Sequence, residues 1–179
     1  LAIAPGSPAR VFFANSGSEA NDTQIKIVRY YNNALGRPLK KKILSRHGAY
    51  HGVTLGATSL SGLKPMHDVF DLPLPGFLHL SAPHHYRIAP DGATEEQFSD
   101  LLGTELEELI DREGGDTIAA MIAEPVMGAG GVIVPPKGYF ERIAPILEAH
   151  DILLIVDEVI CGFGRLGTAF GSHHFDLKP

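Results

Sequence analysis

The stretch "ILLIVDEVICGFGR", residues 152–165, decides the fold class of this chain. Five apolar residues run directly into Asp157 and Glu158, which is typical of a strand that is buried on both faces and ends in a polar loop. Such strands belong to parallel sheets that helices cover on both sides. Because ligands of these sheets bind outside the carboxyl ends of the strands, Asp157 marks a candidate site.

The rest of the chain supports this class, because segments with strand character alternate with segments of helical periodicity. In the clearest helix, Thr94 and Gln97 match a capping box and Gly114 stands at the expected end. Pro145 should bend or weaken the last helix. The pattern predicts a doubly wound α/β domain, with strands at 10–15, 40–46, 77–80, 116–126 and 152–159 and helices at 16–36, 93–115 and 137–151.

Composition narrows the function classes. The chain has 179 residues, 44% of them hydrophobic, which suffices for one globular domain with a core. Its net charge is −6 and its only basic block is Lys40-Lys41-Lys42, so nucleic acid is not the expected partner. No apolar run has the length of a membrane span. The single cysteine, Cys161, fits a reducing compartment, and we expect a cytoplasmic protein.

The stretch "NSGSEAND", residues 15–22, opens the first predicted helix. The free backbone N–H groups and the dipole of a helix N-terminus favour a phosphate. Gly17 would let the backbone approach such a group, and Ser18 would add a hydroxyl donor. Serine is also a common N-cap, so an ordinary cap without a ligand remains the alternative at this point.

Two nucleotide-binding interpretations compete with this one. "LLIVDE", residues 153–158, is similar to the acid-ending strand of a P-loop ATPase, but the Gly-Lys pair of that motif occurs nowhere in the chain. "GFGRLG", residues 162–167, spells a dinucleotide fingerprint, which requires a helix to open at its glycines. The residues that follow favour a loop instead. We therefore predict that no helix begins at Gly164.

The histidines raise the question of a metal site. His47 and His51 are four residues apart, but the HExxH pattern is absent, and Gly48 and Gly52 disfavour a helix there. Solvated histidines in loops are the preferred interpretation, and the paired His84-His85 and His173-His174 are treated alike. No metal is expected. Cys161 has no partner base in its sequence neighbourhood and is interpreted as a packing residue.

Four segments in order, "FFANSGSEAND", "RHGAYHGVT", "IAEPVMGAGGVIVPP" and "LLIVDEVICGFGR", resemble the class III aminotransferases. The resemblance runs nearly end to end and is closest to the ω-aminotransferase branch. It implies a fold type I large domain that binds pyridoxal 5′-phosphate (PLP), with a mostly parallel sheet and helices on both faces. It also implies a homodimer that transfers an amino group from an amine or ω-amino acid to a keto acid such as pyruvate.

The resemblance also implies a set of cofactor-binding residues. Gly17 and Ser18 would hold the phosphate, with Ser16 shaping the turn. Asp157 would pair with the ring nitrogen and favour its protonated form. Strand alternation would place Val159 on the same side as Asp157. Tyr50 and Val159 would lie on the two faces of the ring. Glu124 would support the site by hydrogen bonding, and His51 would lie beside Tyr50. Glu158 would be structural.

One departure from the family concerns the lysine that forms a Schiff base with the cofactor. None of the chain's lysines lies in the family's lysine context, which would follow shortly after "FDLKP". We therefore expect residues 1–179 to be a partial large domain, inactive alone, without the N-terminal segment, the lysine region and the C-terminal small domain. An aminomutase or decarboxylase on the same fold, or a non-catalytic binding or regulatory derivative, are the alternatives.

Overall fold

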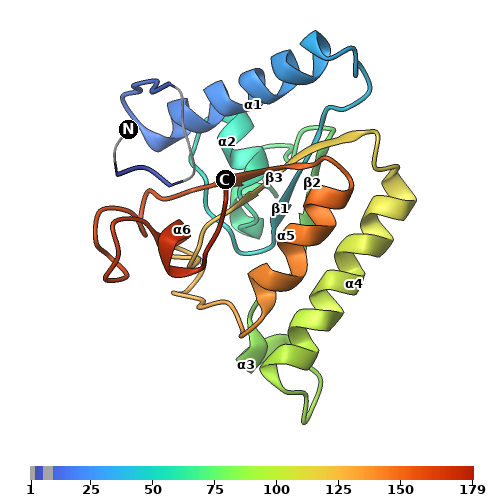
Figure 1. Ribbon diagram of the computed structural model, residues 1–179. Coiled ribbons are helices and arrows are strands. Elements are labelled where there is room, and N and C mark those ends of the chain that lie inside the picture. Colours follow the sequence, from blue (N-terminus) through green and yellow to red (C-terminus); the bar gives the residue numbers. More distant parts are fainter. Residues whose placement is uncertain (1–2, 6–9) are drawn as a thin grey trace.

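The computed structural model describes residues 3–5 and 10–179, and it has a single parallel sheet at its centre (Figure 1). The strand order is β2-β1-β3-β4, and every neighbouring pair is parallel. This confirms the α/β class. The strands are β1 (Lys42–Arg46), β2 (Phe77–Leu80), β3 (Ile118–Ala123) and β4 (Leu153–Val156), and the helices are α1 (Gly17–Ala34), α2 (Leu55–Leu60), η1 (Lys64–Met66), α3 (His85–Ile88), α4 (Glu95–Glu113), α5 (Tyr139–Ala149) and α6 (Gly171–His174).

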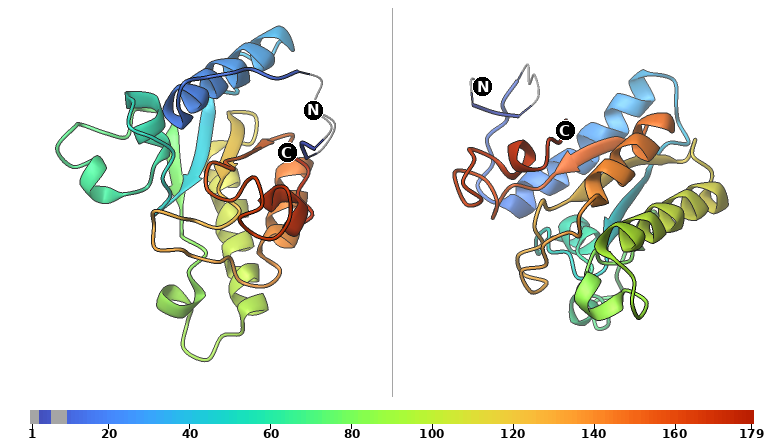
Figure 2. Two further views of the ribbon diagram at one scale, coloured as in Figure 1. Left: turned by 90° about the vertical axis from the view of Figure 1, so that its left-hand side faces the viewer. Right: turned by 60° about the horizontal axis from the view of Figure 1, so that its bottom comes forward.

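Helices cover both faces of the sheet because the apolar strand residues alternate between two cores (Figures 1 and 2). Ile43 packs in a cluster with α1 and α2, whereas its neighbour Leu44 packs in the larger cluster with α4 and α5. All six residues of β3 are buried. This central strand therefore has no face open to water, which explains its continuous apolar sequence.

Local signals predicted the helix ends well. Thr94 and Gln97 form the capping box at the start of α4, and Gly114 ends that helix with a φ of +82°. Pro145 lies inside α5, which still runs as one helix from Tyr139 to Ala149. The predicted extent of β2, residues 77–80, agrees with the structure. None of the helices in the described part of the chain has the length and apolar character needed to cross a membrane.

The strand predicted at residues 10–15 is wrong. This segment pairs with no strand among the described residues, and Val11, Phe12 and Phe13 are 55%, 65% and 89% exposed. A strand is defined by its hydrogen-bonded neighbour as well as by its own side chains. The apolar sequence therefore indicated strand propensity, but it did not supply the partner that burial requires.

β4 lies at one edge of the sheet and is less buried than the central strand β3. β4 pairs with β3 on one side, and among the described strands nothing pairs with its other side. Its residues are accordingly only half-buried, in contrast to those of β3. The strand that carries Asp157 at its end is thus an edge strand in this chain.

Three histidine rings lie together beside α2. His79 of β2 stacks on His47 and meets His67 edge-on, with ring centroids 5.5 Å apart in both pairs. Its Nε2 lies 3.0 Å from the carbonyl of Ser61. Burial lowers the pKa of His79 from 6.5 to about 4. The hydrogen bond to Ser61 raises this pKa, but burial outweighs it, and the neighbouring histidines lower the pKa further.

Because the pKa of His79 is lowered, we expect it to make the folded chain less stable in acid. In the unfolded chain His79 binds a proton near pH 6.5, whereas in the folded chain its pKa is about 4. The contribution of His79 to the free energy of unfolding is therefore fully present above pH 6.5 and is lost as the pH falls toward 4. Between pH 7 and pH 4.5, the free energy of unfolding should therefore fall by roughly 1–3 kcal/mol less in His79→Gln than in the wild type. Urea unfolding at the two pH values measures this difference. The exposed His173→Gln is the control. Equal pH dependence in both variants would contradict the assignment.

Candidate active site

Polar residues follow three neighbouring strands at the same edge of the sheet. The Tyr50–His51 loop follows β1, Glu124 follows β3 directly, and Asp157 follows β4 directly. Parallel pairing brings these ends together, and the backbone N–H of Asp157 donates to the carbonyl of Ala123 at 2.9 Å. The strand-end grouping of polar residues predicted from the sequence is therefore present.

The Asp157 carboxylate lies at the centre of this group of polar residues. Its Oδ2 accepts hydrogen bonds from His51 Nδ1 at 2.8 Å and from Asn21 Nδ2 at 3.1 Å. Its Oδ1 accepts the backbone N–H of Val159 at 3.1 Å. The side chain of Asp157 is only 7% exposed, and that of His51 is fully buried. Since an ionised carboxylate only accepts, the hydrogen of this bond lies on His51 Nδ1.

The charge of Asp157 follows from these contacts. Burial alone would raise its pKa, but hydrogen bonds from His51, the Val159 N–H and Asn21 outweigh burial, so the pKa lies below its usual value. The group is therefore a carboxylate at neutral pH. Three of its roughly four acceptor positions are occupied, and one on Oδ1 remains for another N–H donor.

The N-terminus of α1 lies beside this carboxylate. Ser16 is the N-cap, and its Oγ accepts the N–H of Glu19 at 3.2 Å. Helix geometry leaves the N–H groups of Gly17 and Ser18 without acceptors inside the helix, and these groups favour an anion. A Cβ at Gly17 would lie 3.2 Å from Val159 Cγ2. Gly17 and Ser18 thus begin the helix beside the turn that follows Asp157.

The loop after β1 packs against the first turn of α1. Gly52 has a φ of +132°, and a Cβ there would lie 2.4 Å from Ser18 Oγ. The same oxygen accepts the N–H of Val53 at 3.0 Å. Because its hydroxyl hydrogen is not used in that bond, Ser18 can still donate to an anion at the helix end.

Glu124 fixes the position of Tyr50. The buried Glu124 carboxylate accepts the Tyr50 N–H on Oε1 at 3.1 Å and the Gly128 N–H on Oε2 at 2.9 Å. Both oxygens are thus committed to backbone groups, which agrees with the predicted supporting role. The Tyr50 residue is 36% exposed, so its ring can contact a ligand.

Two neighbours of Asp157 behave differently. Glu158 is structural, as predicted, since its carboxylate accepts the N–H groups of Gly171 and Ser172 at the start of α6. Val159 lies beside Gly17, but strand alternation was the wrong reason for its position. β4 ends at Val156 and Val159 lies in a turn, so alternation along a strand does not place it.

The histidine prediction needs two corrections. His85 begins α3 and is half-buried, with its Nε2 2.8 Å from the carbonyl of Ala93. His51 is not a solvated loop residue, because its N–H donates to Ser61 Oγ at 2.8 Å and its carbonyl accepts Asn21 Nδ2 at 2.7 Å. These bonds hold the loop beneath α1 and bury the ring. His173 and His174 are exposed, as expected. In residues 3–5 and 10–179, no three His, Cys, Asp or Glu side chains are grouped to bind a metal.

The glycine-rich segment is not a dinucleotide site. Residues 162–167 form turns, Gly164 has a φ of +98°, and the nearest following helix is the four-residue α6. The prediction that no helix begins at Gly164 is confirmed. Cys161 is buried with its Sγ 3.5 Å from the carbonyl of Val126, and burial raises its pKa. Its thiol is therefore a packing group.

Sequence reasoning missed Asn21, although a signal was available. Asn21, Ile25, Val28 and Asn32 fall at helical spacing and form the buried stripe of α1. An amide on the apolar side of a helix has to find hydrogen-bonding partners. That rule, applied to the sequence alone, would have marked Asn21 as part of a polar network.

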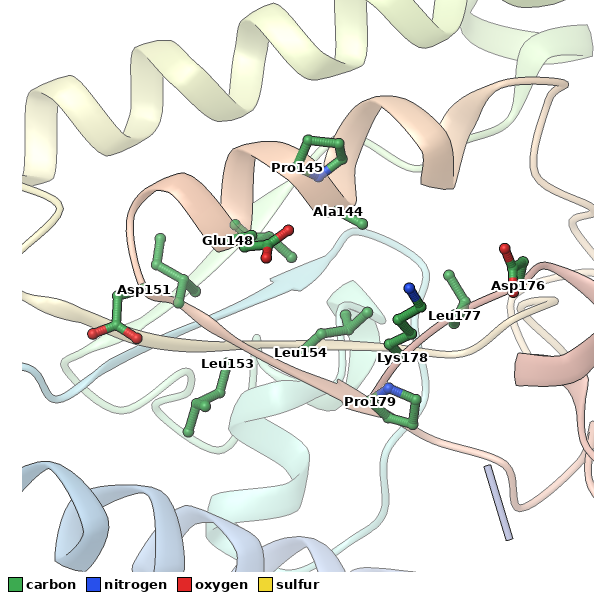
Figure 3. A pocket seen from close by; sticks show the side chains of 12 residues that line it. Ala144, Pro145, Glu148, Asp151, Leu153, Leu154, Asp176, Leu177, Lys178 and Pro179 are labelled. Carbon is green, nitrogen blue, oxygen red and sulfur yellow. The ribbon is translucent and has the colours of Figure 1, made fainter. Parts of the chain in front are cut away.

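A cavity of about 520 Å³ lies away from these residues, between α5, β4 and the end of the chain (Figure 3). Asp151, Leu154 and Lys178 are among its lining residues, and none of the strand-end acids is. A smaller apolar cavity of about 240 Å³ adjoins the loop after Gly52 and is lined by Val53, Leu55, Thr58, Met66, Phe70 and Leu72. Convergent polar groups mark the surroundings of Asp157, rather than the larger cavity, as the chemical site.

The sequence matches the family described as aminotransferase class-III over residues 1–179. The chain belongs to the class-III aminotransferases. Curated relatives include a vanillin aminotransferase of Capsicum frutescens, 61% identical over 96% of this chain, and a gamma aminobutyrate transaminase 3, chloroplastic, of Solanum lycopersicum, also 61% identical over 96% of it. The chain spans 37% and 33% of the length of these two class-III relatives.

Solved structures place the fold in the same group. An omega transaminase from Pseudomonas jessenii, solved in complex with PMP, is 58% identical and has a TM-score of 0.98, with coverage of 99% of this chain and 39% of that one. A transaminase solved with L-ala is 56% identical with the same TM-score, covering 99% and 41%. The class-III chain therefore has the fold type I architecture that its sequence resemblance implied.

Proposed function

We propose that this chain forms the cofactor-binding part of an aminotransferase that binds PLP and transfers an amino group from an amine or ω-amino acid to a keto acid such as pyruvate. The observation that carries the proposal is the Asp157 carboxylate, which three N–H donors hold beside the N-terminus of α1. One end of the sheet thus offers an anion site and a fixed negative charge. A phosphorylated pyridine ring needs both.

The residues present fit this cofactor. The N–H groups of Gly17 and Ser18, with the Ser18 hydroxyl, would hold its phosphate. The free acceptor position on Asp157 Oδ1 would take the ring N–H. The exposed Tyr50 ring would lie on one face, where aromatic stacking is worth ~0.5–1.5 kcal/mol beyond area burial, and Val159 would cover the other.

PLP, when bound, supplies an electron sink for the substrate bonds that break. The task of Asp157 is to hold a proton on the ring nitrogen, which strengthens that sink. A close carboxylate favours the protonated nitrogen by roughly 1–3 pKa units, or ~1.4–4 kcal/mol. Because its own hydrogen bonds keep Asp157 ionised, this charge is present at neutral pH.

We place the lysine that the reaction needs outside residues 1–179. The amino groups of several lysines bind partners remote from Asp157, which supports this view. Lys40 binds the carbonyl of His150, and Lys42 binds Glu113. Lys41, Lys64 and Lys137 bind Asn33, Asp68 and Glu96.

The test is a substrate panel with the protein at its full length and loaded with PLP. The names of the relatives guide the choice of donors, which are γ-aminobutyrate and vanillylamine, the amine that corresponds to vanillin. Pyruvate is the acceptor that the sequence resemblance implies. We expect formation of alanine together with the aldehyde of the donor. An α-amino acid offered without a keto acid tests the alternatives, because release of CO₂ or migration of the amino group within that molecule would instead support a decarboxylase or an aminomutase.

A further inference from the structure

The side-chain amide of Asn21 joins three parts of the site. Asn21 is 3% exposed and stands one helical turn after Gly17 in α1. Its Nδ2 donates to the carbonyl of His51 at 2.7 Å and to Asp157 Oδ2 at 3.1 Å. Both hydrogens of this nitrogen are therefore used, one for the loop after β1 and one for the acid after β4.

We propose that Asn21 is a positioning residue, which sets the Asp157 carboxylate at a fixed place relative to the anion-binding start of α1. The inference rests on the proposed function, since it concerns how the PLP site is held. A ligand with a phosphate at one end and a ring nitrogen at the other needs a fixed spacing between its two anchors. Asn21 supplies it, because it belongs to the same rigid helix as Gly17 and bonds directly to Asp157.

Other side chains cannot reproduce this arrangement. Removing the amide would leave the buried carbonyl of His51 without this donor and would take one of two donors from Asp157 Oδ2. Aspartate at position 21 has the same shape but no N–H, and it would set a second carboxylate against the first. Two carboxylates at that distance repel, which raises the pKa of one of them.

A second buried asparagine in α1 provides a matched control. Asn32 is 1% exposed, and its Nδ2 donates to the carbonyl of Val28 within the helix at 3.0 Å. It shares residue type, helix and burial with Asn21, but this hydrogen bond stays inside the helix. Asn32→Ala therefore reports what the loss of a buried amide does to stability alone.

The experiment uses the full-length protein without cofactor. Its affinity for pyridoxamine 5′-phosphate (PMP) and, separately, for inorganic phosphate is measured by titration calorimetry. At pH 7.5 we expect Asn21→Asp to weaken PMP binding at least about tenfold and Asn21→Ala about three- to tenfold. Phosphate binding should change less than about twofold in both, because the α1 N-terminus is intact. Asn32→Ala should bind both probes as the wild type does.

The pH dependence separates positioning from packing. At each pH, the loss of PMP affinity in a variant is measured relative to the wild type. In Asn21→Asp this loss should become smaller toward pH 5.5, because one carboxyl takes a proton, whereas in Asn21→Ala it should not. A packing role predicts the reverse order at pH 7.5, with alanine worse than the isosteric aspartate and both probes weakened alike. That result would overturn the inference.

The remaining outcomes are also decisive. A wild-type protein that does not bind PMP would refute the proposed function itself, and wild-type binding in both Asn21 variants would refute the role of Asn21 alone. If only Asn21→Ala fails to fold, Asn21→Asp decides through its pH dependence. Unfolding of both, with Asn32→Ala folded, would make Asn21 a stabilising residue and count against the proposal.

Discussion

Replacing Asp157 by asparagine in the full-length enzyme should lower the rate of amino-group transfer roughly ten- to a thousandfold at saturating cofactor. Asparagine can direct its carbonyl toward His51 and Asn21, so its NH₂ group takes the place of Oδ1, faces the ring nitrogen and gives up the bond from the Val159 N–H. It can donate to that nitrogen but cannot hold a positive charge there. The effect should fall on kcat, because the charge assists most in the transition state.

Cofactor affinity should fall far less in this variant, since the contacts that we propose between the phosphate and Gly17 and Ser18 would remain. Steady-state kinetics and cofactor titration measure the two effects separately. Asp22→Asn is the matched control, because Asp22 Oδ1 accepts the Ala57 N–H at 3.1 Å and an amide oxygen can do the same. Wild-type turnover in Asp157→Asn would show that Asp157 is only a structural acid.

Gly52→Ala is expected to have the largest effect on stability, lowering the free energy of unfolding by roughly 2–6 kcal/mol. Two costs combine at this position. Its φ of +132° is strained for any residue with a Cβ. The added Cβ would also lie 2.4 Å from Ser18 Oγ and 2.8 Å from Ala57 Cβ, so either α1 or the loop has to move.

Gly131→Ala separates these two costs, because Gly131 has a similar φ of +124° but nothing within 4 Å of an added Cβ. It should cost only the backbone strain, about 1–3 kcal/mol. Urea unfolding compares the variants directly. In Gly52→Ala, phosphate binding should weaken as well, since the displaced atom belongs to Ser18. Equal stability losses in the two variants would mean that the loop absorbs the steric conflict.

Much of the fold could be predicted because its signals are local. The apolar run before Asp157 identified β4, and the capping box of Thr94 and Gln97 fixed the start of α4. The grouping of Tyr50, Glu124 and Asp157 followed from one rule of parallel sheets. These inferences need only periodicity, caps and the direction of strands.

What failed depends on contacts between distant residues. The segment with Phe12 and Phe13 looked like a buried strand, but pairing is a property of two segments and no partner lies beside it among the described residues. His51 looked like a loop histidine, yet Asp157, 106 positions away, binds its ring. Asn21 differs from both, because helical spacing alone could have placed its amide in the interior.

The unpaired side of β4 matters for anyone who prepares residues 1–179 as a separate polypeptide. Along Leu153–Val156, backbone donors and acceptors point away from β3 with no neighbouring strand in the described part of the chain. This strand contains neither charge nor proline, and of the devices that protect an edge strand it has only its short length of four residues. Such an edge is a template for intermolecular strand addition. A particle mass measured on this polypeptide would therefore include any strand addition along β4, and the quaternary structure of the full-length protein has to be measured on a molecule in which that edge is covered.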